Sequence, residues 1–215
     1  MAERRWWRRG PDARLARERY GRLAATFDPS AVEPLRRRAI ARLGVGPGQT
    51  VLDAGCGIGA SFARIEAGIG STGRLIGVDQ SPEMLARAQA RAKEAGWENV
   101  TLVESSADAM PAVGPVDRAL IFYVHDVMRS PAALDRILAQ VRPGGRVVAA
   151  GPRWAPWWAF PLSLWVWHIA RPYHTTFEGF QRPWSHLAAR AARLDVERIV
   201  FGRAYFSYIA VATVR

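Results

Sequence analysis

The chain has 215 residues, 49% of them apolar, and a formal net charge of +11. This length suits one domain, or one domain with a small appendage, and the apolar content excludes a globally disordered chain. The single cysteine, Cys56, excludes an intrachain disulfide, and no Cys/His spacing typical of zinc is present, so we expect no metal site.

The positive charge is concentrated near the N-terminus, where residues 1–42 hold twelve arginines and five acidic residues, a net of +7. We expect residues 1–44 to form an Arg-rich helical arm or cap on a domain that spans 45–215. Such charge attracts lipid or nucleic-acid phosphates, although it also fits a solvated helix face. No nucleic-acid-binding module accompanies it, so a nucleic-acid partner is not expected. Arg4–Arg9 is not followed by the apolar core of a signal peptide, which favours a cytoplasmic protein, with peripheral membrane contact as an alternative.

Hydrophobic periodicity predicts two N-terminal helices, at 12–26 and 31–43, separated by Asp28-Pro29-Ser30. Strands and helices then alternate. The predicted strands are 50–53, 74–79, 100–104, 117–123 and 146–150, and the predicted helices are 60–67, 82–95 and 132–141. This alternation predicts a parallel sheet covered on both faces.

The C-terminal part follows a different pattern. We expect residues 153–184, which are rich in aromatic side chains, to form a lid with a helix at 160–170. A helix at 185–194 is predicted to precede two extended runs, 197–202 and 205–214, joined by a turn at Arg203-Ala204. This antiparallel hairpin brings the predicted strands to seven.

A glycine motif, Asp53-x-Gly55-x-Gly57-x-Gly59, connects the first strand to its helix. Glycines allow a sharp turn and close approach of a ligand to the backbone, and a helix N-terminus offers free N–H groups. A carboxylate at position 53 suits a ligand with an ammonium group and would repel a pyrophosphate. Asp79, at the end of the second strand, is placed to accept hydrogen bonds from ribose hydroxyls.

With these motifs the chain resembles the class I, seven-strand S-adenosylmethionine-dependent methyltransferases over roughly residues 45–151. The resemblance is nearest to the small-molecule and quinone-biosynthesis group. The matching segments are Val51–Gly59, Gly77–Leu85, Ala107–Pro111 and Val141–Gly145. The resemblance implies an α/β, three-layer Rossmann-like sandwich with a mostly parallel seven-strand sheet. It also implies methyl transfer from S-adenosylmethionine, which leaves S-adenosylhomocysteine, with the cofactor lying across the carboxyl ends of the first strands.

The residues expected to bind the cofactor lie in the glycine motif and after the next strands. They are Asp53, Gly55, Cys56, Gly57, Gly59, Asp79, Gln80, Met84, Ser106, Ala107 and Phe122. Where the family often has an Asp that accepts from the adenine amino group, this chain has Ser106, and Asp108 is the alternative.

The exit of the fourth strand, Tyr123-Val124-His125-Asp126, is expected to face the methyl group. A histidine oriented by a carboxylate is a candidate general base, so we take His125, Asp126 and Tyr123 as candidate catalytic residues. The alternative is that no base is needed, and that positioning of a reactive sulfonium carries the reaction.

The aromatic segment has three interpretations: the wall of an apolar acceptor site, a surface resting on a membrane, or a plug for the core. Its apolar stretch, 155–170, is 16 residues long and is interrupted by Pro156 and Pro161, which is short for a membrane span. The candidate substrate contacts are Tyr20, Phe27, Trp157, Tyr173 and His174.

We therefore expect transfer of a methyl group to a small apolar or aromatic acceptor. One alternative is methylation of a membrane lipid or quinone at the membrane surface, and another is cofactor binding without catalysis.

Overall fold

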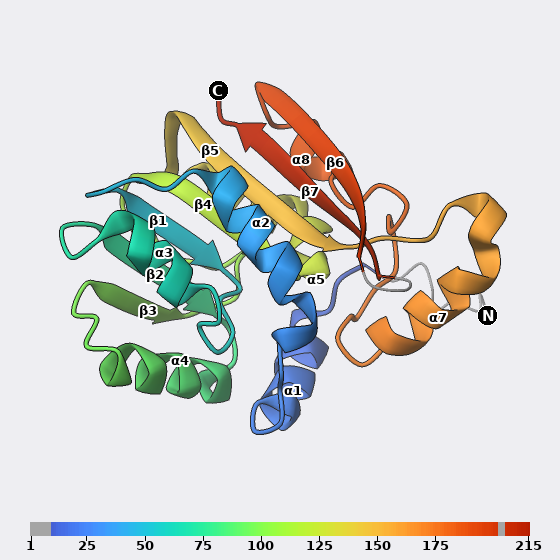
Figure 1. Ribbon diagram of the computed structural model, residues 1–215, viewed down its shortest axis with the longest axis horizontal. Coiled ribbons are helices and arrows are strands. Elements are labelled where there is room, and N and C mark those ends of the chain that lie inside the picture. The colour runs from blue at the N-terminus through green and yellow to red at the C-terminus, as the bar shows by residue number, and fades with distance from the viewer. Residues whose placement is uncertain (1–9, 202–204) are drawn as a thin grey trace.

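The computed structural model describes residues 10–201 and 205–215 (Figure 1). Seven strands form one sheet in the order β3-β2-β1-β4-β5-β7-β6. Their bounds are β1 Thr50–Ala54, β2 Arg74–Asp79, β3 Val100–Glu104, β4 Val116–Phe122, β5 Val141–Pro152, β6 Arg193–Phe201 and β7 Tyr205–Thr213. Strands β1 to β5 are parallel, and β7 runs antiparallel to both β5 and β6. This confirms the predicted α/β fold with its C-terminal hairpin.

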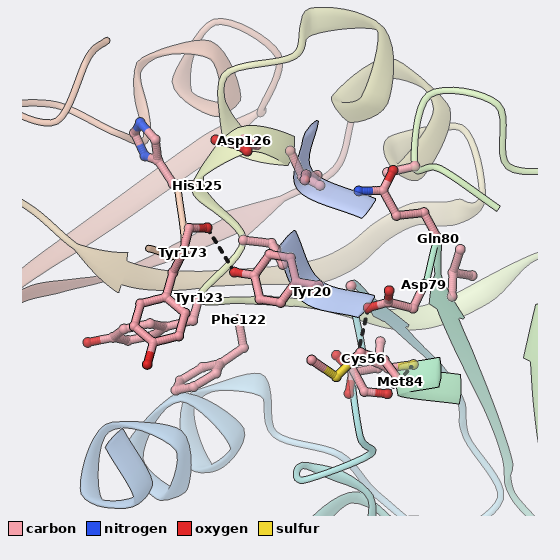
Figure 2. Close-up of a pocket in the computed structure, with 18 of the residues that line it drawn as sticks. Tyr20, Cys56, Asp79, Gln80, Met84, Phe122, Tyr123, His125, Asp126 and Tyr173 are labelled. Atoms are coloured by element: carbon pink, nitrogen blue, oxygen red, sulfur yellow. Dashed lines mark hydrogen bonds between the residues drawn. The ribbon is translucent and has the colours of Figure 1, made fainter. Parts of the chain in front are cut away.

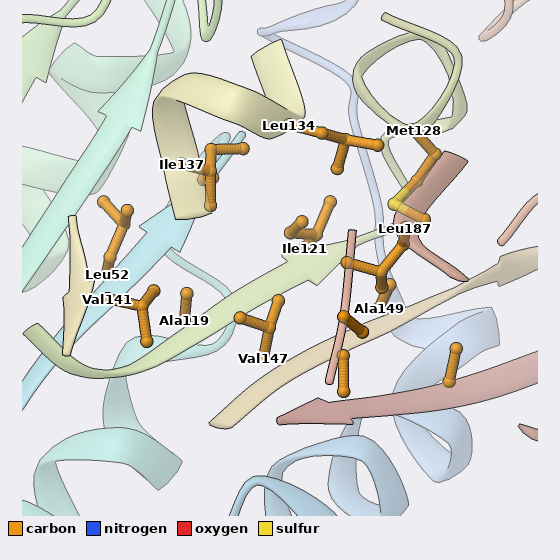
Figure 3. Close-up of a cluster of buried hydrophobic side chains, with 14 of the residues drawn as sticks. Leu52, Ala119, Ile121, Met128, Leu134, Ile137, Val141, Val147, Ala149 and Leu187 are labelled. Atoms are coloured by element: carbon orange, nitrogen blue, oxygen red, sulfur yellow. The ribbon is translucent and has the colours of Figure 1, made fainter. Parts of the chain in front are cut away.

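Helices cover both faces of the sheet (Figure 1). The helices α2 (Glu33–Leu43), α3 (Phe62–Ile69) and α4 (Pro82–Glu94) lie on one face, and α5 (His125–Met128), α6 (Pro131–Leu138) and α8 (Ser185–Ala188) lie on the other. Side chains alternate along a strand, so Leu120 of β4 packs on the first face while Ala119 and Ile121 pack on the second. Figure 3 shows this second cluster, in which the strand residues meet Leu134 and Leu187.

Local sequence explains where the helices begin and end. The Ser81 side chain accepts a hydrogen bond from the Met84 N–H at the start of α4, and Ser130 caps α6 in the same way. Asp12 caps α1 (Ala13–Leu23). Gly44 ends α2 in the left-handed conformation, with a φ of 62°.

The structure corrects several predicted boundaries and adds one helix. The helix predicted at 185–194 ends at Ala188, because Arg193 and Leu194 already pair with Thr213 and Ala212 in the sheet. Strand β5 begins at Val141 instead of residue 146, since Val141 pairs with Val116 before a bulge in the register. The short helix α5 was not predicted.

The aromatic segment contains a 3-10 turn, η3 (Trp157–Ala159), and helix α7 (Phe160–Ala170), which agrees with the helix predicted at 160–170. Another 3-10 turn, η2 (Ser30–Val32), precedes α2. Figure 1 shows α7 at one end of the molecule, away from the sheet. Within the described ranges, no helix combines the length and apolar character needed to cross a bilayer.

Two features of the sequence fall outside the described residues. They are the arginine- and tryptophan-rich start of the expected arm, at 1–9, and the hairpin turn at Arg203-Ala204.

Candidate active site

A cavity lies at the carboxyl ends of β1, β2 and β4 (Figure 2). The chain leaves β1 toward β2 and β3 and returns to β4 on the other side of β1, so the strand order reverses here. Ligands of open α/β sheets bind at such a reversal. The cavity is lined by residues from α1, from α2 and from the segment between them. The glycine loop, the ends of β2 to β4, α5 and residues 173–174 complete the lining.

The glycine loop presents its backbone to this cavity. Gly55 has a φ of 79° and its N–H donates to the Val78 carbonyl at 2.7 Å, which ties the loop to the end of β2. Gly57 has a φ of 52°, and a Cβ added there would meet no atom within 4 Å. The open space beside Gly57 is therefore available to a ligand. Gly59 does not line the cavity; a Cβ there would meet the Phe62 ring at 2.7 Å, so this glycine allows helix α3 to pack.

Asp79 holds the glycine loop from the end of β2. Its Oδ2 accepts from the Gly57 N–H at 2.9 Å, and its Oδ1 accepts from the Ser81 N–H at 3.0 Å. Burial raises the pKa of Asp79, although these backbone donors oppose the shift. A carboxylate has further lone pairs, so both oxygens can still accept from a ligand hydroxyl.

Asp53 is the most unusual carboxylate of the cavity. Its side chain is buried, and Oδ2 finds no hydrogen-bond partner among the described residues. Burial, with the Asp79 charge adding to it, raises the pKa of Asp53 to about 7, and Arg36 opposes the rise. An unsatisfied buried acceptor costs free energy, which a ligand with a cationic donor would recover.

Arg36 supplies a buried positive charge that was not singled out from the sequence. It lies on α2 with only 4% of its surface exposed, and its guanidinium sits over the Phe122 ring at 4.9 Å. Its Nη1 donates to Glu33 at 2.5 Å, whereas Nε finds no partner among the described residues. A signal was present in the sequence, because Arg36 occupies the same helical stripe as Ala39, Ile40 and Leu43.

Tyr123 leaves β4 in a strained backbone conformation. Among the described residues other than glycine, Tyr123 alone has a positive φ, of 60°. Its N–H donates to the Ala150 carbonyl at 2.7 Å. Such strain costs about 1–3 kcal/mol and is found most often at functional sites. The turn places the rings of Phe122 and Tyr123 together at the cavity, 5.2 Å between centroids.

His125 and Asp126 both line the cavity but do not pair as we expected. His125 Nε2 lies 2.9 Å from the Glu178 carbonyl, to which it must donate, and burial lowers the pKa of His125 well below its usual value. The Asp126 carboxylate instead accepts from the Thr175 hydroxyl at 2.6 Å and from the Thr175 N–H. The two side chains begin α5, and consecutive residues of a helix point in different directions.

The expected substrate contacts separate into two groups. Tyr20, Phe27, Tyr173 and His174 line the cavity, where the Tyr20 hydroxyl donates to the Tyr173 carbonyl at 3.0 Å (Figure 2). Burial lowers the pKa of His174 to about 4. Trp157 does not line the cavity and is 89% exposed, because η3 turns it outward.

The remaining expected cofactor contacts lie around the other end of the cavity. Cys56, Gln80 and Met84 line it beside the glycine loop, and Figure 2 shows them near Asp79. Ser106, Ala107 and Asp108 line the cavity after β3. Both candidates for the adenine contact, Ser106 and Asp108, therefore lie at the cavity.

Comparison with known proteins shows which family of domains contains this site. A family profile described as a methyltransferase domain matches residues 51–145, which include the glycine loop, Asp79 and β4. Residues 51–145 therefore match the family of methyltransferase domains, and the chain resembles the class I S-adenosylmethionine-dependent methyltransferases in its motifs and its fold.

Individual relatives of this chain include a demethylmenaquinone methyltransferase from Lactococcus lactis, 32% identical over 131 residues. A nocamycin O-methyltransferase from Saccharothrix syringae is 31% identical over 139 residues. The matches cover 60% and 62% of the chain, and 52% and 49% of the relatives, so the chain spans about half the length of these relatives. The N-methyltransferase NodS from Bradyrhizobium japonicum, solved with S-adenosylhomocysteine, shares the fold with a TM-score of 0.71. The two are 18% identical, and the match covers 94% of this chain and 99% of that one.

Proposed function

We propose that this methyltransferase transfers a methyl group from S-adenosylmethionine to a small apolar or aromatic acceptor. The observation that carries the proposal is a single cavity with two chemically different ends. Asp53 and Asp79 make one end acidic, while Phe122, Tyr123 and Tyr173 make the other aromatic. S-adenosylmethionine supplies a methyl group on a positively charged sulfur when it is bound.

The residues at the acidic end fit the polar groups of the cofactor. The partnerless Oδ2 of Asp53 suits its ammonium group, and the buried guanidinium of Arg36 suits its carboxylate. Asp79 would accept from the ribose hydroxyls, and the open space at Gly57 would admit the chain of the methionine moiety. Ser106 or Asp108, with Ala107, would meet the adenine edge, and Gln80 and Met84 its face.

At the aromatic end, this chain would act mainly by holding the acceptor in line with the methyl group. His125 is a weak base here, because burial disfavours its charged form more than donation from Nε2 to the Glu178 carbonyl favours it. The Phe27 ring packs edge to face against the rings of Tyr20 and Tyr173, with centroids 6.3 and 6.1 Å away. These three rings would exclude water from the acceptor. Alignment then carries the acceleration.

The relatives named for demethylmenaquinone and nocamycin support a small-molecule acceptor. The test is to incubate the full chain with methyl-labelled S-adenosylmethionine and a panel of hydroquinones, phenols and apolar amines. We expect one class to gain label together with release of S-adenosylhomocysteine. Label on none of them, in a preparation that binds the cofactor product, would contradict the acceptor class.

A second candidate is an acceptor held in a membrane, such as a quinone or an amino lipid. The exposed aromatic side chains of η3 and α7 favour it. Presenting the same acceptors in vesicles and in free solution separates the two candidates, since a membrane acceptor would be methylated faster in vesicles.

A further inference from the structure

Helix α7 and the turn before it expose an unusual set of large apolar side chains. Trp157, Trp158, Phe160, Leu164 and Trp165 are 89%, 72%, 63%, 59% and 52% exposed, and we call them the aromatic patch. Among the described residues, the opposite side of the segment packs against the protein through Ala159, Val166 and Ala170, which join Phe180 and Phe206. Contiguous exposed apolar surface of this kind marks an interaction site.

The charged residues that flank the aromatic segment in the sequence are both basic. Residues 154–170 contain no Asp, Glu, Lys or Arg, and Arg153 and Arg171 lie immediately on either side of them. The Arg171 guanidinium lies over the Trp167 ring at 5.1 Å, on the same helix as the patch. The whole chain carries +11, so a second copy docking on the patch would bring the same charge toward it. An anionic surface with an apolar interior would accommodate the apolar side chains and attract the arginines beside them.

We propose that the aromatic patch inserts into the interfacial layer of a bilayer that contains anionic lipids. Tryptophan favours this layer because its ring is apolar and its N–H is polar, and arginines beside it attract lipid phosphates. The segment would lie in the interface without crossing it, as apolar faces flanked by cations do.

The position of Tyr173 connects the patch to the cavity. Tyr173 follows α7 by three residues, lines the cavity, and is 38% exposed. Docking through α7 would therefore set the acceptor end of the cavity near the lipid, where apolar acceptors partition. Membrane binding stands without the proposed activity, whereas this delivery of the acceptor rests on it.

The test is flotation of the full chain with vesicles of phosphatidylcholine alone and of phosphatidylcholine with phosphatidylglycerol. We expect binding to the anionic vesicles at about 0.1 M salt and weaker binding at high salt, since screening shortens electrostatic attraction. The double variant Trp157→Ser/Trp165→Ser should partition about tenfold less. Arg171→Gln should partition about fivefold less, whereas Arg74→Gln, exposed at the start of β2, removes the same charge and should bind much as the wild type does.

Circular dichroism and calorimetric titration with S-adenosylhomocysteine accompany each variant. Retained folding and cofactor-product affinity with lost vesicle binding would support the membrane surface, and a defect in the methyltransferase site would show in the titration alone. Absence of wild-type binding to anionic vesicles would overturn the proposal. So would equal binding by the double variant, or a dimer in sedimentation that the double variant abolishes.

Discussion

Asp53 combines burial, a pKa raised to about 7, and an oxygen without a partner in the described chain. Its folded-state pKa lies above the ordinary value of about 4, so without cofactor its contribution to the free energy of unfolding falls as pH rises from about 4 to about 7. Asp53→Asn should therefore raise the melting temperature of the cofactor-free protein above pH 7, while weakening its binding of S-adenosylhomocysteine.

Thermal unfolding across this pH range checks the prediction. Glu98→Gln, which removes an exposed carboxylate, is the control and should leave both properties unchanged. If Asp53→Asn melts no higher than the wild type at pH 8, the buried charge of Asp53 does not destabilise the cofactor-free protein as we infer.

Arg36 should contribute to cofactor affinity through its charge. A hydrogen bond between charged groups contributes about 1.5–3 kcal/mol, so Arg36→Gln should weaken S-adenosylhomocysteine binding roughly tenfold to a hundredfold. Arg37→Gln, on the exposed side of the same helix, provides the matched control. Calorimetric titration of both variants decides the matter, and equal affinities would remove Arg36 from the cofactor site.

His125 should remain neutral well below its ordinary titration range, because burial and the nearby His174 and Arg129 lower the pKa of its ring. Together they outweigh the hydrogen bond to the Glu178 carbonyl, which raises the pKa. We expect the NMR signals of this ring to show no titration near the ordinary histidine value of 6.5. Titration near 6.5 would mean that the ring is accessible, and would restore it as a candidate base.

These residues show what spacing can and cannot reveal. Asp53 and Asp79 lie at the ends of predicted strands, and Gly57 lies in the loop after the first of them. Parallel strands bring such positions to one edge of the sheet, so these residues could be placed from the sequence. The expected pairing of His125 with Asp126 was wrong, because it depended on the direction of side chains in a helix that was not predicted. Arg36 was hidden by the many exposed arginines around it.

At the scale of elements, α1 is fastened over the cavity by the segment after α7. The Thr175 hydroxyl donates to Asp126 and accepts from the Asp12 N–H at 3.0 Å, while Arg19 donates to the His174 carbonyl at 2.6 Å. Segments 163 residues apart in the chain thus form one wall of the site.

Thr175→Val removes both hydroxyl hydrogen bonds, so it should lower the free energy of unfolding by about 2 kcal/mol and speed amide exchange in α1. Hydrogen exchange followed by mass spectrometry measures the second effect locally. Thr101→Val, at an exposed position of β3, should change neither. Unaltered exchange in α1 would show that Thr175 does not fasten it.

Element identity was easier to predict than element limits. The first four strands were predicted within one residue at each end, because runs rich in β-branched and apolar residues, bounded by turn-forming residues, mark them in the sequence. The start of β5 and the end of α8 depend on pairing with Val116 and Ala212, which are distant in sequence and leave no local pattern.

At the scale of the whole molecule, alternation and a terminal hairpin sufficed to predict the seven-strand sheet, and its strand reversal locates the cavity. The outward position of Trp157 could not be predicted, because aromatic composition alone fits a cavity wall as well as an exposed surface. The same ambiguity explains why the cofactor end of the site is better defined than the acceptor end.

The central claim is that Asp53, Gly57 and Asp79 form a site for S-adenosylmethionine. Calorimetric titration of S-adenosylhomocysteine into the wild type and a folded Asp79→Ala variant tests it most directly. We predict binding of one molecule per chain and a loss of at least about tenfold in affinity for the variant, since both carboxylate oxygens would accept from the ribose. Undetectable binding by the wild type would contradict the cofactor site, and equal affinity of the variant would contradict the role of Asp79.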